Sequence, residues 1–201
     1  MVLDVESNTV LLRGLADIMS RDDFLHFCMA NKDLRIERDE SGNVLIKAPV
    51  TSDTGRFEAD LVFYLSSWNK EKGDPGVVFS PSTGFTLPDS SMRSPDAAWI
   101  AASRWQSLPK EERQRFAALP PDFIAEIRSP SDSLVKLKAK MTKWIDNGVK
   151  LAWLIDPGAQ NAWVYRANGE IELVEGVDAV LTGEELLPGL EVPLSLFAPE
   201  A

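Results

Sequence analysis

The sequence has one cysteine, Cys28, and one histidine, His26, among its 201 residues. A lone cysteine excludes an internal disulfide, so we expect Cys28 to lie in the core. No second His or Cys is spaced for a shared metal site, so we expect His26 to be a surface or packing residue. The chain also lacks an apolar run of about 18 residues, which excludes a predicted membrane span. Its start, MVLDVESNTV, has neither a basic nor an apolar segment, so we predict no signal peptide and a cytoplasmic protein.

Positive charge is scarce and scattered along the chain. The formal net charge is −10, from 21 Lys and Arg against 31 Asp and Glu. A protein that coats nucleic acid without selectivity needs a basic face, so the composition argues against that class. It allows an enzyme that binds nucleic acid in a local cleft. For such an enzyme we expect binding that is weak or that depends on a divalent metal ion.

Length and composition indicate one domain over residues 1–201. The hydrophobic content of 44% is enough for a full core. A charged helical segment is expected over 109–119, and we interpret 103–119 as a surface helical insertion between two core strands.

The stretch from Pro121 to Pro157 predicts a strand, a turn, a helix and a second strand. The apolar run 123–127 forms the first strand, which Ser129 and Pro130 end. Ser131 or Asp132 is expected to cap a helix that runs to about 147, because apolar residues recur at three- and four-residue steps. Gly148 ends this helix, and 151–155 forms a buried strand. Such a unit normally pairs its two strands in parallel. The apolar helix face consists of Leu134, Leu137, Met141, Trp144 and Ile145.

The flanking segments predict further elements by the same rules. Before the central stretch we expect a short helix from about 20 to 28, a hairpin of 34–38 with 44–48, a helix over 52–72, strands at 77–79 and 97–100, and a polar turn at 90–93. After it we expect a hairpin of 162–166 with 171–174 and a tail, 181–196, that packs on the sheet.

Four residues carry the candidate chemistry. Asp96 begins one predicted strand and Glu126 lies inside another, so each strand offers one carboxylate. Two carboxylates form a hard-oxygen site that suits Mg²⁺. Lys140 lies at the border of the buried helix face, from which its long side chain can reach over the sheet. An ammonium group there can orient a metal-bound water and stabilise charge on a phosphate. Glu58, on the edge of the buried face of the 52–72 helix, is the fourth residue.

Each of these residues also has an ordinary structural interpretation. Glu126 could face solvent from a half-buried strand, Asp96 could bond the backbone of its own turn, and Glu58 could be a solvated helical residue. Three other lysines compete with Lys140 for its role: Lys136, Lys138 and Lys143.

The chain contains, in this order, the runs SPD at 94–96, PDFIAEIRSPS at 121–131, KMTKWIDNGV at 140–149 and WLIDP at 153–157. Together they resemble the Uma family of "putative restriction endonucleases", which belongs to the PD-(D/E)XK nuclease superfamily and is especially abundant in cyanobacteria. The resemblance extends from the first predicted helix to the turn at 156–157. Each run alone is weak, but the ordered set is specific.

The resemblance implies a fold and an activity. The fold is α/β (α+β): a restriction-endonuclease-like mixed sheet flanked by helices, with additional N- and C-terminal hairpins. The activity is hydrolysis of phosphodiester bonds in nucleic acid, above all DNA, by water activated by Mg²⁺ or Mn²⁺. Asp96 and Glu126 would bind the metal together with a main-chain carbonyl near Ile127. Lys140 would position the nucleophile, and Glu58 would match an acid that many members carry on the first helix.

The sequence departs from the superfamily pattern at one position. The superfamily lysine normally lies two residues after the second acid, where this chain has Arg128. In the family the lysine is moved to the helix, at the place of Lys140. The departure keeps a second hypothesis open: a catalytically retired nuclease fold that acts as a DNA-associated or regulatory binding module. Such a site would bind divalent ions poorly. The sequence also allows a homodimer, with Trp163 or the C-terminal tail at its interface.

Overall fold

The computed structural model describes residues 2–6, 9–15 and 19–198, which form two compact units. One unit combines 1–49, 82–94 and 108–120, and the other combines 50–81, 95–107 and 121–201. The single domain over 1–201 and the surface insertion at 103–119 stay predictions. Within the described ranges, no helix is long and apolar enough to cross a membrane.

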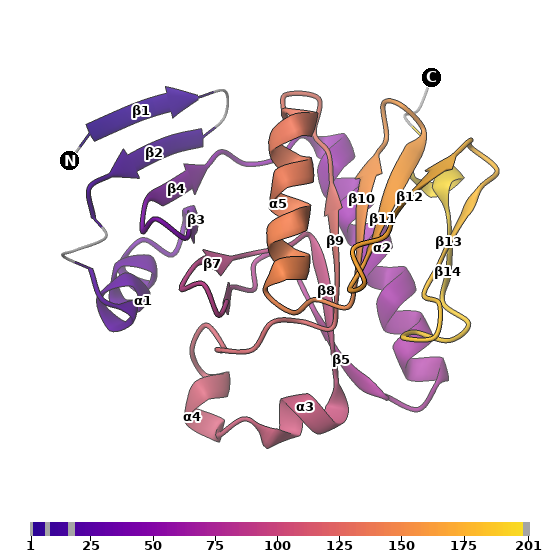
Figure 1. The fold of residues 1–201 in the computed structure, drawn as a ribbon, viewed down its shortest axis with the longest axis horizontal. Coiled ribbons are helices and arrows are strands. Elements are labelled where there is room, and N and C mark those ends of the chain that lie inside the picture. The colour runs from indigo at the N-terminus through magenta and orange to yellow at the C-terminus, as the bar shows by residue number, and fades with distance from the viewer. Residues whose placement is uncertain (1, 7–8, 16–18, 199–201) are drawn as a thin grey trace. The chain divides into compact units, whose positions relative to one another are not determined.

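The first unit is built on a six-stranded sheet in the order β1-β2-β4-β3-β7-β6 (Figure 1). The predicted hairpin is confirmed, because β3 and β4 pair antiparallel. Phe24 of helix α1 (Arg21–Ala30) packs with Ile36, Val44 and Met92 in a small core. The strands are β1 (Val2–Glu6), β2 (Thr9–Arg13), β3 (Arg35–Arg38), β4 (Val44–Lys47), β6 (Phe85–Thr86) and β7 (Met92–Arg93).

Two predictions for this unit are wrong in part. The polar turn expected over 90–93 ends in strand β7, because Met92 packs in the core and pairs with Arg38. The helix expected over 109–119 is only α4 (Lys110–Arg113). Its continuation is lost because Ala117 forms a parallel bridge with Phe85. Tertiary pairing therefore overrides the local helical pattern in this segment.

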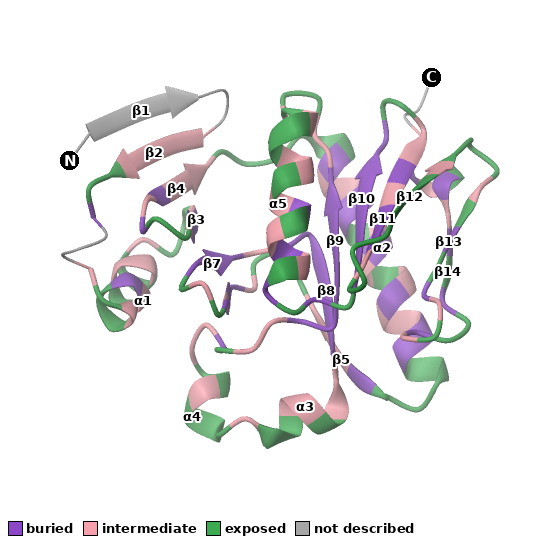
Figure 2. Cartoon of the chain, viewed as in Figure 1, coloured by how far each residue is buried: buried purple, intermediate pink, exposed green. Residues whose placement is uncertain are grey.

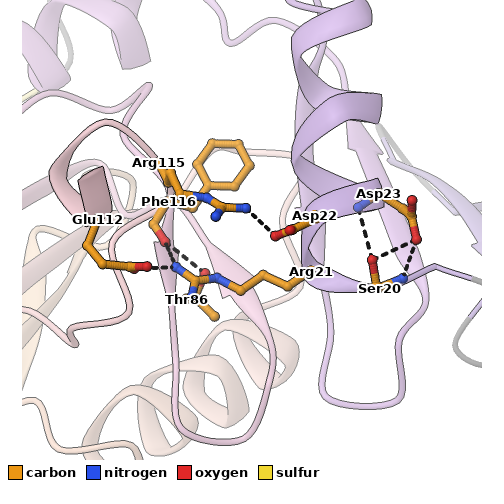
Figure 3. Close-up of polar contacts among 8 residues, drawn as sticks. All are labelled: Ser20, Arg21, Asp22, Asp23, Thr86, Glu112, Arg115 and Phe116. Atoms are coloured by element: carbon orange, nitrogen blue, oxygen red, sulfur yellow. Dashed lines mark hydrogen bonds and ion pairs between the residues drawn. The ribbon is translucent and has the colours of Figure 1, made fainter.

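Arginine side chains connect α1 to α4 and to the segment that follows α4 (Figure 3). Ser20 and Asp23 form a capping box at the start of α1. In the first turn of the helix, Arg21 donates to Oε2 of Glu112 at 2.8 Å and to the main-chain carbonyl of Phe116 at 2.9 Å. Arg115 forms an ion pair with Asp22 in the opposite direction. The segment is thus held by side chains, which the sequence pattern alone does not indicate.

The second unit is built on a mixed six-stranded sheet in the order β12-β11-β10-β9-β8-β5 (Figure 1). Only β9 and β10 run parallel, as predicted for the strand–helix–strand unit. All other neighbours pair antiparallel. The strands are β5 (Gly76–Phe79), β8 (Ala97–Ala101), β9 (Phe123–Ile127), β10 (Leu151–Asp156), β11 (Asn161–Arg166) and β12 (Ile171–Glu175).

Helices α2 (Ser52–Glu71) and α5 (Leu134–Asp146) cover the two faces of this sheet. The apolar stripe of α2 packs against alternate residues of β9 and β10 in one core. On the other face, Met141 and Trp144 of α5 are fully buried, while the outer side of α5 is exposed (Figure 2). The mixed sheet flanked by helices is therefore confirmed. The stripe of α2 consists of Phe57, Leu61, Leu65 and Trp68.

The end of the chain completes the core on the α2 side. Strands β13 (Val180–Thr182) and β14 (Glu191–Pro193) pair antiparallel and lead into a 3-10 helix, η1 (Leu194–Phe197). Phe197 packs edge-on against Phe57, with ring centroids 5.9 Å apart. The prediction that the tail packs on the sheet is confirmed.

The ends of α5 differ in how well the sequence predicts them. Gly148 has φ 102°, the left-handed conformation expected after the helix. The predicted cap, Ser131 or Asp132, is wrong: Ser133 is the N-cap. Asp132 instead accepts a hydrogen bond from the Ser129 amide at 2.9 Å, so its carboxylate closes the turn before the helix. A helix absent from the prediction, α3 (Ala102–Ser107), follows β8.

Candidate active site

The register of β8 on β9 brings Asp96 and Glu126 together. The antiparallel pair aligns Ala98 with Ile124 and Ala97 with Ala125, and Asp96 comes directly before β8. The Asp96 amide donates to the Ala125 carbonyl at 3.0 Å, so Asp96 lies beside the strand residue that precedes Glu126. The two carboxylates are close enough for the negative charge of Glu126 to act on Asp96. Two neighbouring strands therefore present two carboxylates at one place, as the sequence predicts.

Asp96 is held by the backbone of the neighbouring strand. Its Oδ2 accepts a hydrogen bond from the Ile127 amide at 2.7 Å, and 8% of the residue is exposed. Burial, together with the negative charges of Glu126 and Glu58, raises the pKa of the Asp96 carboxyl to about 8, against the opposing effects of the Ile127 amide and Lys140. The turn interpretation of Asp96 does not account for this contact with a second strand.

Glu126 lies in a strand whose five residues are all buried. Its Oε1 is 2.6 Å from Nζ of Lys140 and accepts a hydrogen bond from Nε1 of Trp144 at 3.0 Å. The alternative in which Glu126 faces solvent is thus excluded. Lys140 is the α5 lysine whose ammonium group contacts Glu126, whereas that of Lys138 lies over the ring of Trp163, 3.9 Å from its centroid.

Glu58 approaches the same place from α2. It is 8% exposed, so it is not the solvated helical glutamate of the alternative interpretation. Its charge contributes to the raised pKa of Asp96, which places it in electrostatic contact with that carboxyl. The structure therefore gathers all four candidate residues: Glu58 from α2, Asp96 from the start of β8, Glu126 from β9 and Lys140 from α5.

Trp144 is a member of this site that the sequence analysis assigned only to the apolar face of α5. Its ring is fully buried, yet its N–H points to Glu126. The signal is present in the sequence, because Trp144 lies four residues after Lys140 and hence on the same helix face. An analysis of apolar periodicity treats a tryptophan as a core residue and takes no account of its N–H, which is a hydrogen-bond donor.

Comparison with known proteins identifies the family of this chain. A family model, Uma2, described as "Putative restriction endonuclease", matches residues 21–196. The chain belongs to the Uma2 family. A crystal structure of "a putative nuclease belonging to DUF820" from Anabaena variabilis ATCC 29413 superposes with a TM-score of 0.67, at 23% identity, over 81% of this chain and 88% of that one. That similarity shows a shared fold. No curated protein matches the chain.

In this Uma2 chain, Arg128 forms an ion pair with Asp156. It follows β9, and its Nη1 lies 2.6 Å from Oδ2 of Asp156 at the end of the parallel strand β10. Its Nε also donates to the Asp132 carbonyl at 3.2 Å. The position that holds the lysine in the superfamily pattern thus joins the ends of two strands and the loop before α5, and the cation nearest Glu126 comes from α5 instead.

The residues fit a single hard divalent ion. Across 2–6, 9–15 and 19–198, no group of three or more His, Cys, Asp and Glu side chains is arranged as a metal site. Mg²⁺ usually keeps several waters and takes only one or two protein carboxylates, a number that Asp96 and Glu126 supply. A divalent cation between them would also offset the burial and the repulsion that together raise the pKa of Asp96.

A second buried acid in the same unit shows the opposite electrostatics. The Asp122 side chain is fully buried and lies 2.8 Å from both Arg104 and Lys150. Its Oδ2 accepts from the Ala101 amide at 2.9 Å. Burial acts to raise the pKa of Asp122, but these donors outweigh it and hold the pKa below its ordinary value. Asp122 is a paired structural acid, whereas Asp96 is kept at an electrostatic cost.

This contrast predicts opposite effects of two equivalent substitutions. Asp96→Asn should stabilise the ion-free protein, because the native state no longer has to hold a proton that the unfolded chain releases. The gain should grow as pH rises from about 4 to about 8, and reach roughly 1–3 kcal/mol. Asp122→Asn should destabilise by a similar amount at pH 7, since its ion pairs are lost. Thermal unfolding in EDTA between pH 5 and 8.5 measures both, and a loss of stability in Asp96→Asn would contradict the assignment.

Proposed function

We propose that the protein is a metal-dependent endonuclease that hydrolyses phosphodiester bonds, with DNA as its substrate and Mg²⁺ or Mn²⁺ as its cofactor. The observation that carries the proposal is the pair of neighbouring buried carboxylates, Asp96 and Glu126, with the Lys140 ammonium 2.6 Å from Glu126. Membership of a family described as restriction endonucleases supports it. We place the reaction in the cytoplasm, on the evidence of a single cysteine.

The chain's own residues divide the work. Asp96, once deprotonated, and Glu126 would hold the ion. When bound, such an ion polarises a phosphate and lowers the pKa of a coordinated water. Lys140 now neutralises Glu126. With an ion held by the two carboxylates, the Lys140 ammonium group would orient the attacking water and stabilise charge on the phosphate. Glu58, whose negative charge acts on Asp96, would help to hold a further water.

The overall charge is consistent with this division. At −10 the chain repels a polyanion at long range, so affinity for nucleic acid has to come from the site itself. A divalent cation there would add two positive charges where the phosphate binds. The competing hypothesis, a retired fold that acts as a DNA-associated or regulatory module, needs no such ion, and ion binding therefore separates the two.

The first test is a calorimetric Mn²⁺ titration of the wild type and of the double variant Asp96→Asn/Glu126→Gln. We expect saturable binding to one site in the wild type and none in the double variant. The control is Glu71→Gln/Glu175→Gln, which removes the same charge from two exposed positions and should bind as the wild type does. Equal binding by all three proteins would contradict the site, and no binding by the wild type would favour the retired module.

The affinity for Mn²⁺ should depend on pH. Because the pKa of Asp96 is raised to about 8, an ion has to displace its proton at lower pH. The dissociation constant should therefore rise by up to about tenfold for each pH unit below 8 and level off above it. Titration in buffers of different ionisation enthalpy should show up to one proton released per ion at pH 7. A pH-independent affinity between 6 and 8.5 would contradict this.

A DNA-cleavage assay distinguishes the role of the two metal-binding carboxylates from the role of Lys140. Single Asp96→Ala and Glu126→Ala variants should lose cleavage of plasmid DNA and also lose Mn²⁺ binding. Lys140→Met should keep Mn²⁺ binding, since it removes a competitor for Glu126, yet lose roughly 100-fold or more in cleavage rate. A Lys140→Met protein that cleaves at the wild-type rate would show that another cation serves the reaction.

A further inference from the structure

Two buried tryptophans in the same unit differ in whether the indole N–H has a hydrogen-bond acceptor. Trp144 on α5 and Trp153 on β10 are both fully buried. The N–H of Trp153 has no hydrogen-bond acceptor, and its ring packs edge-on against Phe123 with centroids 4.7 Å apart. The N–H of Trp144 donates to Oε1 of Glu126 at 3.0 Å. A buried indole normally finds an acceptor, and here only Trp144 aims its donor at a candidate metal ligand.

The same oxygen of Glu126 accepts two donors from one helix. Lys140 Nζ and Trp144 Nε1 both contact Oε1, and the two residues lie one turn apart on α5. Both of these contacts meet Oε1, so α5 holds the carboxylate through this oxygen. A group that fixes one oxygen of a carboxylate sets the direction of the other.

The two hydrogen-bond donors to Glu126, Lys140 and Trp144, differ in how firmly the protein holds them. Lys140 has a long side chain that is 11% exposed, and in the proposed reaction it orients the attacking water. The Trp144 indole is rigid, fully buried and carries no titratable proton. It can therefore keep Glu126 in place while the ammonium group orients the water.

We infer that Trp144 is a positioning residue: its indole N–H fixes Oε1 of Glu126 and so directs Oε2 to the metal. This inference rests on the proposed function for its role in the reaction. The contact between Trp144 and Glu126 does not depend on that role, which allows the two to be tested separately.

The test compares Trp144→Phe with Trp153→Phe, because each replaces a fully buried indole by a smaller ring and only the first removes a donor from Glu126. We expect the Mn²⁺ dissociation constant to rise roughly 10- to 100-fold in Trp144→Phe and to stay within about twofold of the wild type in Trp153→Phe. Equal affinity of Trp144→Phe and the wild type would overturn the inference. An equal loss in Trp153→Phe would also overturn it, since the effect would then be one of packing.

Two further measurements keep the inference decidable. If Trp144→Phe does not fold, benzothienylalanine at position 144 has sulfur in place of the N–H and keeps the shape of the ring. If the wild type binds no Mn²⁺, the proposed function fails, and a double-variant cycle in Tm decides the contact. The Tm changes of Trp144→Phe and Glu126→Leu should then be clearly non-additive, because a leucine at position 126 cannot accept the indole N–H, while those of Trp153→Phe and Glu126→Leu should add. Additive changes in the first pair would overturn the inference.

Discussion

The register between β8 and β9 is the constraint on which the candidate site depends. With Ala97 opposite Ala125, the buried carboxylates of Asp96 and Glu126 lie close together. Such an arrangement costs free energy in the absence of a cation, because burial and then the negative charges of Glu126 and Glu58 raise the pKa of Asp96. Asp122, a few residues before Glu126, shows that the same unit can bury an acid with its pKa lowered by paired cations. Sites kept at a cost to stability are where function is expected.

Helix α5 contributes both to the hydrophobic core of the unit and to the candidate site. Met141 and Trp144 fill the space over the sheet, so the packing of the helix fixes where its other side chains can reach. One turn separates Lys140 from Trp144, and both meet the same oxygen of Glu126. Helix α5 therefore places the Lys140 ammonium and the Trp144 N–H at the Glu126 carboxylate. Any shift of α5 along the sheet would move these two side chains together.

Periodicity predicts much of the second unit, because its central strands and helices bury continuous apolar runs. The stretch 121–157 and the hairpin after it follow from patterns that are local in sequence, whereas Asp96 and Glu126 are singled out as a pair only by the resemblance to the family. Features set by distant partners do not follow from local patterns. The burial of Glu58 depends on where α2 meets the sheet, the short α4 depends on the bridge between Phe85 and Ala117, and the choice of Ser133 as the helix cap depends on Asp132 being used by the preceding turn. The hydrogen bond of the Trp144 N–H also depends on a distant partner, since its acceptor, Glu126, lies 18 residues away in the sequence.

The contacts of Arg128 give a physical reason for a lysine on the helix. A side chain two residues after Glu126 lies beyond the end of β9, where the parallel strand β10 presents the buried carboxylate of Asp156. An arginine can bond this carboxylate and the Asp132 carbonyl at once, whereas a lysine at the same place offers a single point charge. Joining the two strand ends in this way removes the cation from Glu126. The positive charge at the site then has to come from elsewhere, and α5 supplies it through Lys140, whose Nζ lies 2.6 Å from Oε1 of Glu126.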